Sequence, residues 1–149
     1  MEIKDILKKL REKNNLTQEQ LAERVLVTRQ AVSRWENGET QPNTDTLKLL
    51  SKEFNVSINT LIGSPRKLIC QCCGMPLNED GFISRETDGN YNEDYCKWCY
   101  TDGKFTYQNK EDLLDFLIKN MPNHNNLDND TRRIEFDSYL SHLEHWKHN

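Results

Sequence analysis

The stretch QEQLAERVLVTRQAVSRWEN, residues 18–37, decides the fold of the first part of the chain. Its apolar residues recur where two short helices around a tight turn must bury them. Ala22 is small where the two helices would cross at close range, and Val27 closes the turn. The expected inner faces consist of Leu21, Ala22 and Val25 in the first helix and Val32 and Trp35 in the second. This pattern predicts a helix-turn-helix.

Polar side chains remain on the outer face of the second helix. They are long enough to reach base edges, and a single helix is slim enough to enter the major groove of DNA. Arginine can bond to guanine O6 and N7 with two donors, and glutamine can pair with adenine in the same way. We therefore expect base contacts from Arg29, Gln30 and Arg34, and a contact to a base or a phosphate from Ser33.

From about Ile3 to Gly63 the sequence resembles the lambda-repressor-like (XRE) family of bacterial and phage DNA-binding domains. The positions that carry the resemblance are Thr17-Gln18, Leu21-Ala22, Gln30-Ala31-Val32, Trp35-Glu36-Asn37-Gly38 and Pro42. The resemblance implies a compact five-helix bundle that binds double-stranded DNA. Members of the family usually bind as a homodimer on two half-sites roughly 34 Å apart.

The resemblance also implies roles for residues near the two helices. Gln18 starts the first helix, whose amide dipoles favour a phosphate, and by resemblance it would also brace Gln30. Arg11 and Glu36 match a salt-bridged pair in related repressors, so we expect both to belong to the scaffold. The remaining candidates for DNA contact are Thr28, which caps the second helix, and Asn37 and Thr40, which would contact the DNA backbone.

The ends of these helices carry recognisable signals. Thr17 with Gln20 is typical of a capping box, and Asn37-Gly38 would stop the second helix because both residues tolerate the left-handed conformation. The turn departs from the family, which often has a glycine where this chain has Leu26. A non-glycine residue at positive φ costs roughly 1 kcal/mol. Either that strain is tolerated or the turn has another shape.

Three further helices are expected around this pair. Ile3–Lys13 has apolar residues on one face at helical spacing. A fourth helix is predicted at about Thr44–Phe54, and SINTLIG, residues 57–63, gives a short fifth.

The length of the chain allows one ordinary domain or two small ones. Of its 149 residues 35% are hydrophobic and 30% are charged, which is a lean composition for a small core. Turn formers and charge in residues 64–67 predict a linker. We therefore expect a helix-turn-helix domain over residues 1–63 and a second domain over residues 68–149.

The net charge of −4 hides a difference between the two parts of the chain. Residues 1–67 hold 12 Lys and Arg against 9 Asp and Glu, a net charge of +3. Residues 68–149 hold 8 against 15, a net charge of −7. The positive part is the one with the helix-turn-helix, as attraction to phosphate requires.

The sequence also bears on the compartment. No apolar run approaches the length of a membrane span, and the first residues, MEIKDILKKLREKN, do not resemble a signal peptide. We therefore expect a cytoplasmic protein without a membrane partner. Five cysteines in a reducing compartment favour metal ligands or redox thiols over disulfides.

Two Cys-x2-Cys pairs, Cys70 with Cys73 and Cys96 with Cys99, are separated by 22 residues. This spacing is typical of a tetrathiolate zinc ribbon, because each pair directs two sulfurs at one metal ion. Four thiolates leave no coordination position for a substrate, so we expect a structural zinc ion and no enzyme activity. The sequence from Cys70 onward also resembles a family of zinc-ribbon domains found with bacterial regulators.

The zinc set leaves Cys72 and three histidines without a role. Cys72 is either a spare, partly exposed thiol or a thiol beside the metal whose oxidation would eject zinc. His142, His145 and His148 recur at every third residue. They either bind a second metal or, more simply, contact the negative end of a helix.

The second part of the chain combines two kinds of pattern. Glycines with β-branched and aromatic residues in residues 68–107 predict β-hairpins, and helical patterns return in Lys110–Met121 and Thr131–Lys147. The expected fold class is therefore mainly α. It comprises a five-helix lambda-repressor-like bundle and a small β-hairpin zinc ribbon followed by two C-terminal helices.

These patterns favour a sequence-specific, DNA-binding transcriptional regulator that acts as a repressor-like homodimer and carries structural zinc. One alternative is an antitoxin or adaptor that docks a protein partner through its zinc-ribbon domain. A second alternative is a regulator that senses redox state or metal, in which thiol oxidation or zinc loss changes DNA affinity.

Overall fold

The computed structural model describes residues 1–147, which divide into two compact units. The first unit contains Met1–Lys67 together with Asp88–Tyr91, and the second contains Leu68–Thr87 and continues from Asn92. The limits expected from the sequence, residues 1–63 and 68–149 with a linker at 64–67, stay a prediction.

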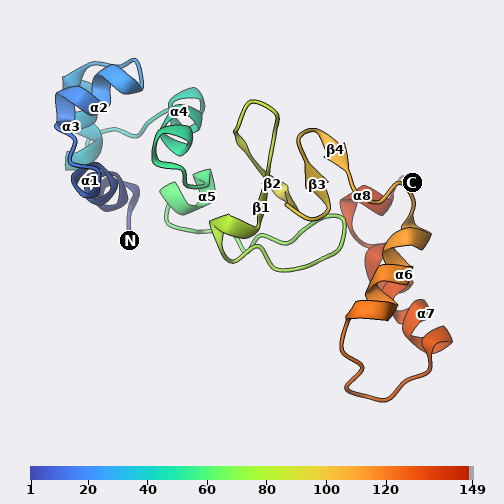
Figure 1. Cartoon of the computed structure of the whole chain (residues 1–149). Helices are drawn as coiled ribbons and strands as arrows, with labels where there is room; N and C mark the ends of the chain where they lie inside the picture. The colour runs from blue at the N-terminus through green and yellow to red at the C-terminus, as the bar shows by residue number, and fades with distance from the viewer. Residues whose placement is uncertain (148–149) are drawn as a thin grey trace. The chain divides into compact units, whose positions relative to one another are not determined.

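The first unit contains the five predicted helices, coloured blue to green in Figure 1. They are α1 (Ile3–Lys13), α2 (Gln18–Arg24), α3 (Arg29–Asn37), α4 (Thr44–Phe54) and α5 (Ile58–Leu61). The side chains of Thr17, Thr28, Asn43 and Ser57 cap the last four of them, each by accepting a backbone N–H of the first turn. Thr17 and Gln20 form the expected capping box. Local sequence signals therefore set where these helices begin.

One apolar core holds the first unit together. Its fully buried members include Leu7 of α1, Leu21 of α2, Val32 of α3 and Leu50 of α4. Helix α3 packs against both α1 and α2, so its inner face is fixed by two neighbours. The turn before it contains Leu26 at φ 60°, with 82% of the residue exposed. The chain thus tolerates the left-handed conformation there without any gain from burying the side chain.

The second unit begins with two small sheets. The 3-10 helix η1 (Asp80–Phe82) leads into strand β1 (Ile83–Arg85), which pairs with β2 (Tyr91–Cys96). Strand β3 (Tyr100–Thr101) pairs antiparallel with β4 (Lys104–Phe105). The predicted hairpins are confirmed.

Helices α6 (Lys110–Asn120), α7 (Asn129–Leu140) and α8 (Glu144–Lys147) follow the sheets, and α6 packs against α7 (Figure 1). Both predicted C-terminal helices are therefore present. The expected extent of the second, Thr131–Lys147, was wrong, because the chain leaves the helix at Ser141 and begins α8 at Glu144. The backbone amides of Glu144 and His145 bond to Gln71 instead of to the preceding turn, which accounts for the interruption.

A buried arginine joins α7 to the end of α6. Arg132 donates hydrogen bonds to the carbonyls of Ile118, at 3.0 Å, and Met121, at 2.9 Å. These carbonyls lie at the C-terminal end of α6, where carbonyl groups have no partner within the helix. Within residues 1–147 no helix is both long enough and apolar enough to cross a membrane.

Candidate nucleic-acid interface and metal centre

Helix α3 presents a row of donors because its opposite face is fixed in the core. The helix begins after Thr28, whose Oγ1 accepts the N–H of Ala31 at 3.1 Å, and it ends at Gly38, where φ is 78°. Val32 and Trp35 are buried, so the remaining positions of each turn face outward. Among the predicted DNA-contacting residues, Arg29, Gln30 and Arg34 are exposed and Ser33 is half-buried.

The exposed side chains of α3 have no polar partners in the part of the chain that the structure describes. Within residues 1–147 Arg29, Gln30 and Arg34 make no side-chain hydrogen bond and no ion pair. Guanidinium and amide groups without partners are available to base edges or phosphates. The outer face of α3 can therefore bind a polar, negatively charged ligand without first breaking internal contacts.

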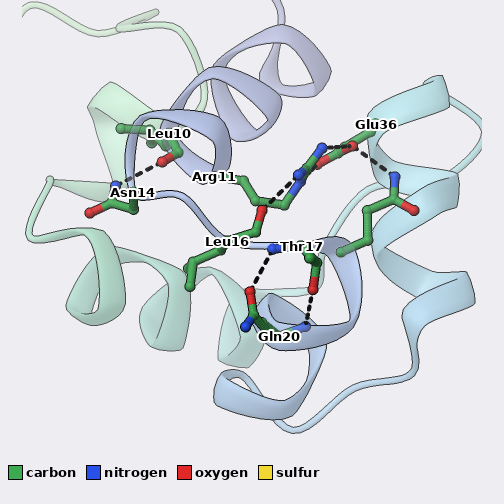
Figure 2. A network of polar contacts seen from close by, with 8 residues as sticks. Leu10, Arg11, Asn14, Leu16, Thr17, Gln20 and Glu36 are labelled. Atoms are coloured by element: carbon green, nitrogen blue, oxygen red, sulfur yellow. Dashed lines mark hydrogen bonds and ion pairs between the residues drawn. The ribbon is translucent and has the colours of Figure 1, made fainter.

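A buried network ties α3 to α1 and α2. Figure 2 shows Arg11 reaching Glu36, with Nε to Oε1 at 2.5 Å and Nη2 to Oε2 at 3.0 Å. Arg11 also donates to the carbonyl of Leu16 at 2.8 Å, and Gln18 Nε2 donates to Glu36 Oε2 at 2.9 Å. The predicted ion pair is confirmed. It holds the loop before α2 and the last turn of α3 in a fixed relation.

The ionisation of Glu36 reflects this network. Burial of the carboxylate by itself opposes ionisation, but the hydrogen bonds from Arg11 and then Gln18 outweigh it and lower the pKa of Glu36 below its ordinary value. The side chains of Arg11 and Glu36 are only 12% and 5% exposed. The pair is thus charged, buried and mutually dependent.

The other predicted DNA contacts lie around the same helices. Gln18 is the first residue of α2, but its amide bonds to Glu36, and the expected brace to Gln30 is absent from the described residues. That detail of the prediction was wrong because the carboxylate offers Gln18 a charged acceptor, which gives a stronger hydrogen bond. Thr28 uses its hydroxyl as the cap of α3. Asn37, the last residue of α3, and Thr40, in the loop after it, are both exposed.

Four cysteine sulfurs converge in the second unit. The Sγ atoms of Cys70, Cys73, Cys96 and Cys99 all lie within 4.8 Å of one another. Cys73 and Cys96 come from different pairs, and their sulfurs are 3.9 Å apart. A zinc ion with Zn–S bonds of about 2.3 Å at the centre of a tetrahedron requires sulfurs about 3.8 Å apart. The residues present therefore fit a tetrathiolate zinc ion.

The local backbone directs these sulfurs inward. The first pair lies in a tight turn that the bridge between Ile69 and Pro76 closes. In this turn the N–H groups of Cys72 and Cys73 point to Cys70 Sγ, at N–S distances of 3.4 and 3.5 Å. The second pair joins the end of β2 to the start of β3. Amides aimed at a sulfur stabilise its thiolate form, which is the form that binds metal.

Each cysteine thiol shifts the pKa of its neighbours in the cluster. Hydrogen bonds from the thiol of Cys73, and then from those of Cys96 and Cys99, lower the pKa of Cys70 far below its ordinary value. The same crowding raises the pKa of Cys99, chiefly through its hydrogen bond with Cys70. A divalent cation at the centre would stabilise all four thiolates together.

One expectation about a residue beside the metal site was wrong, and one neighbour of the site was missed. Cys72 is fully buried, so the expected partial exposure was wrong. The structure buries it because Trp146 covers this turn and donates from Nε1 to the carbonyl of Cys72. Sequence reasoning missed Trp146 as a neighbour of the metal site. Its only signal was the apolar stripe of the last helical segment.

The histidines have separate surroundings. His142 Nδ1 lies 2.8 Å from the carbonyl of Ser138, in the last turn of α7. His145 packs among Tyr95, Phe105 and Trp146, and burial lowers its pKa below the ordinary value. His148 lies outside the described residues. In residues 1–147 the four cysteines form the only group of at least three His, Cys, Asp or Glu side chains arranged to hold a metal ion.

The fold and the two sites define a helix-turn-helix domain joined to a zinc ribbon. Residues 7–61 match the family described as "Helix-turn-helix". Residues 69–147 match the family described as "Putative zinc ribbon domain". This second match covers more than half of the chain, and the chain belongs to this zinc ribbon family.

Several known proteins are similar to part of this chain. The HTH-type transcriptional activator BcrR of Enterococcus faecalis is 50% identical over 62 residues, which are 42% of this chain and 30% of that protein. Antitoxin PezA of Streptococcus pneumoniae serotype 4 is 34% identical over 62 residues, which are 42% of this chain and 39% of that protein. The matched residues thus span only 30% to 39% of the length of these curated relatives. The P22 c2 repressor, solved in complex with synthetic operator 9T, is 31% identical with a TM-score of 0.42, and the match covers 43% of this chain and 97% of that one.

Proposed function

We propose that this protein is a transcription regulator that binds double-stranded DNA through α3 and holds a structural zinc ion in its second unit. The observation that carries the proposal is the row formed by Arg29, Gln30 and Arg34. These side chains are exposed and unpartnered within residues 1–147, while Val32 and Trp35 fix the opposite face of the helix.

The proposed reading of DNA has two components. Arg29, Gln30 and Arg34 contact base edges and supply sequence preference, with Ser33 at a base or a phosphate. Gln18, at the start of α2, together with Thr28, Asn37 and Thr40, lies against the sugar-phosphate backbone and sets the register. The net charge of +3 over residues 1–67 favours the approach to DNA.

A regulator of this kind reads two half-sites as a homodimer. The match of residues 7–61 to the helix-turn-helix family, and the likeness of part of the chain to a relative named as a transcriptional activator, support a regulatory role. The domain limits proposed here are residues 1–63 for DNA binding and 68–149 for the zinc ribbon, with residues 64–67 as linker.

Zinc would be held by Cys70, Cys73, Cys96 and Cys99. When bound, it supplies four strong bonds that a unit with such short strands uses in place of a larger core. All four positions of a tetrahedral ion are filled by protein ligands, so the role is structural. We therefore assign the protein to a non-enzyme class.

The experiment that tests this function is selection of random duplex DNA by the zinc-loaded, full-length protein. We expect enrichment of a palindrome with half-sites one helical turn apart. Arg29→Ala should then weaken binding by about 1–3 kcal/mol and relax the preference at one base pair. The control is Arg24→Ala, which removes the same charge from a side chain already paired with Glu53 at 2.6 Å. Failure to enrich any sequence at low salt would contradict the proposal.

A second candidate function is that of an antitoxin or adaptor bound to a protein partner. The likeness of part of the chain to antitoxin PezA favours it. A stable stoichiometric complex with a second protein, together with no DNA preference, would support this candidate over the first. The redox-sensing alternative gains no support from Cys72, because that thiol is fully buried.

A further inference from the structure

The turn that carries Cys70 and Cys73 is held from outside by the last two helices of the second unit. Trp146 of α8 is buried, and its Nε1 donates to the carbonyl of Cys72 at 2.7 Å. The backbone N–H of His145 donates to the carbonyl of Gln71 at 3.2 Å. The hydroxyl of Tyr139 of α7 donates to the carbonyl of Gly74 at 3.2 Å. Three carbonyls of one short turn therefore have partners from residues 139–146.

Two of these peptide groups point their N–H toward the sulfur cluster. The carbonyl of Gln71 and the N–H of Cys72 belong to one planar peptide unit, as do the carbonyl of Cys72 and the N–H of Cys73. The two N–H groups donate to Cys70 Sγ. Each peptide unit is thus held at its oxygen by α8 while its nitrogen is aimed at a sulfur. A hydrogen bond at the oxygen also polarises the N–H and strengthens its own hydrogen bond.

We infer that α8 and the end of α7 form the outer shell of the metal site, with Trp146 as a positioning residue for the peptide groups that hydrogen-bond to Cys70. This inference rests on the proposed binding of zinc by the four cysteines. Outer-shell partners orient metal ligands, and their loss typically costs 10- to 100-fold in metal affinity.

The close fit of Tyr139 supports the same role. Gly74 has φ 80°, and a Cβ atom at this position would lie 2.3 Å from Cε1 of the Tyr139 ring. The turn thus packs its backbone against the ring of Tyr139, at a positive φ that favours glycine. Side chains and backbone of the turn both meet the C-terminal helices, since Gln71 Oε1 also accepts the N–H of Glu144 at 3.1 Å.

The coupling between the docking of α8 and the binding of metal is reciprocal. If docking of α8 tightens metal binding by some factor, metal binding stabilises the docking of α8 by the same factor. The occupancy of the four-cysteine site therefore controls whether Trp146 and the last helical turn stay packed. Zinc loss would release a helix end as well as a metal ion.

The test compares zinc release from the full-length, zinc-loaded protein and three variants, using a chromophoric chelator in excess. Trp146→Phe keeps an aromatic ring and removes the donor to Cys72. Tyr139→Phe removes only the donor to Gly74. The matched control is Tyr91→Phe, which removes a hydroxyl that donates to the carbonyl of Asn55 at 3.1 Å in the first unit. We expect roughly tenfold faster release for Trp146→Phe, a smaller increase for Tyr139→Phe and no change for the control.

Cobalt(II) substitution supplies a spectroscopic readout that loss of stability alone would not move. We expect Trp146→Phe to shift the thiolate-to-cobalt charge-transfer band, because the hydrogen bonds to Cys70 Sγ change. Chelation of zinc from wild-type protein should in turn speed hydrogen exchange at the amides of Glu144 and His145.

The outcomes separate this inference from the proposed metal site. A wild-type protein that retains no zinc would overturn the site itself. A wild-type protein that retains one zinc ion, with Trp146→Phe and Tyr139→Phe matching its release rate and cobalt spectrum, would overturn the outer-shell role. If Trp146→Phe does not fold, Tyr139→Phe decides the question, because it deletes a single hydroxyl from a half-exposed ring.

Discussion

The ion pair between Arg11 and Glu36 makes a sharp prediction for the stability of the first unit. Replacing Glu36 by Gln keeps the shape of the side chain and one oxygen acceptor for Arg11, but it leaves a buried guanidinium without a counter-charge. Removal of one partner from a buried pair costs about 3–5 kcal/mol. Because Gln retains part of the hydrogen bonding, we expect Glu36→Gln to lower the free energy of unfolding by about 2–3 kcal/mol.

The chain offers a matched control for this change. Glu53 pairs with Arg24 at 2.6 Å, but the arginine side chain is 54% exposed. Exposed pairs contribute about 0–1 kcal/mol, so Glu53→Gln should have little effect. The measurement is native-state hydrogen exchange at the amide of Val32 in α3, read in full-length protein, because that amide reports on the first unit alone. Equal losses for the two variants would refute the reasoning.

The pH dependence adds an independent check. The pKa of Glu36 is lower in the folded protein than its ordinary value of 4.5. The unfolded chain therefore binds more protons in acid, and the unit becomes more stable as the pH rises. This contribution is fully present above pH 4.5 and is lost as the pH falls through the folded pKa. Glu36→Gln should lack it, and a wild-type acid profile in that variant would contradict the assignment.

Three further outcomes are expected. Arg132→Ala should lower the free energy of unfolding of the second unit by about 2–3 kcal/mol in a urea titration, because two carbonyls at the end of α6 lose a charged donor. Arg133→Ala breaks only exposed ion pairs, so it should have a small effect in the same titration. Leu26→Gly should raise the melting temperature of the first unit, because it removes roughly 1 kcal/mol of strain at positive φ without losing buried surface. An unchanged melting temperature would argue against strain at this position. Chelation of zinc should loosen the cysteine turns and α8 and leave the helices of the first unit intact, since the buried residues of their core lie within residues 7–61. Loss of all helical circular dichroism would contradict this.

Local signals account for most of what the sequence predicted. The bounds of α1 and α4, the capping box of Thr17 and Gln20, and the buried face of α3 follow from helical spacing and caps within a few residues. The convergence of the four cysteine sulfurs also follows from paired spacing. Family resemblance supplied the pairing of Arg11 with Glu36, which no local pattern indicates.

The remaining features depend on contacts between distant segments. The burial of Cys72 and the end of α7 both result from bonds to residues that lie 73 or 74 positions away in the chain. Arg132 finds its acceptors at the end of another helix, and no spacing rule predicts a buried arginine there. The side-chain amide of Gln18 bonds to Glu36 and not to Gln30, because a carboxylate is a stronger acceptor than the amide of a second glutamine.

The contact between Trp146 and the carbonyl of Cys72 also has a consequence for synthesis of the chain. The ribosome must add 74 residues after Cys72 before the indole that covers it exists. At 5–20 residues per second this takes roughly 4–15 s. During that interval the helices of the first unit are already complete in sequence, while the first cysteine turn is still uncovered. A nascent chain thus passes through a period in which its thiols are open to competing metals and oxidants.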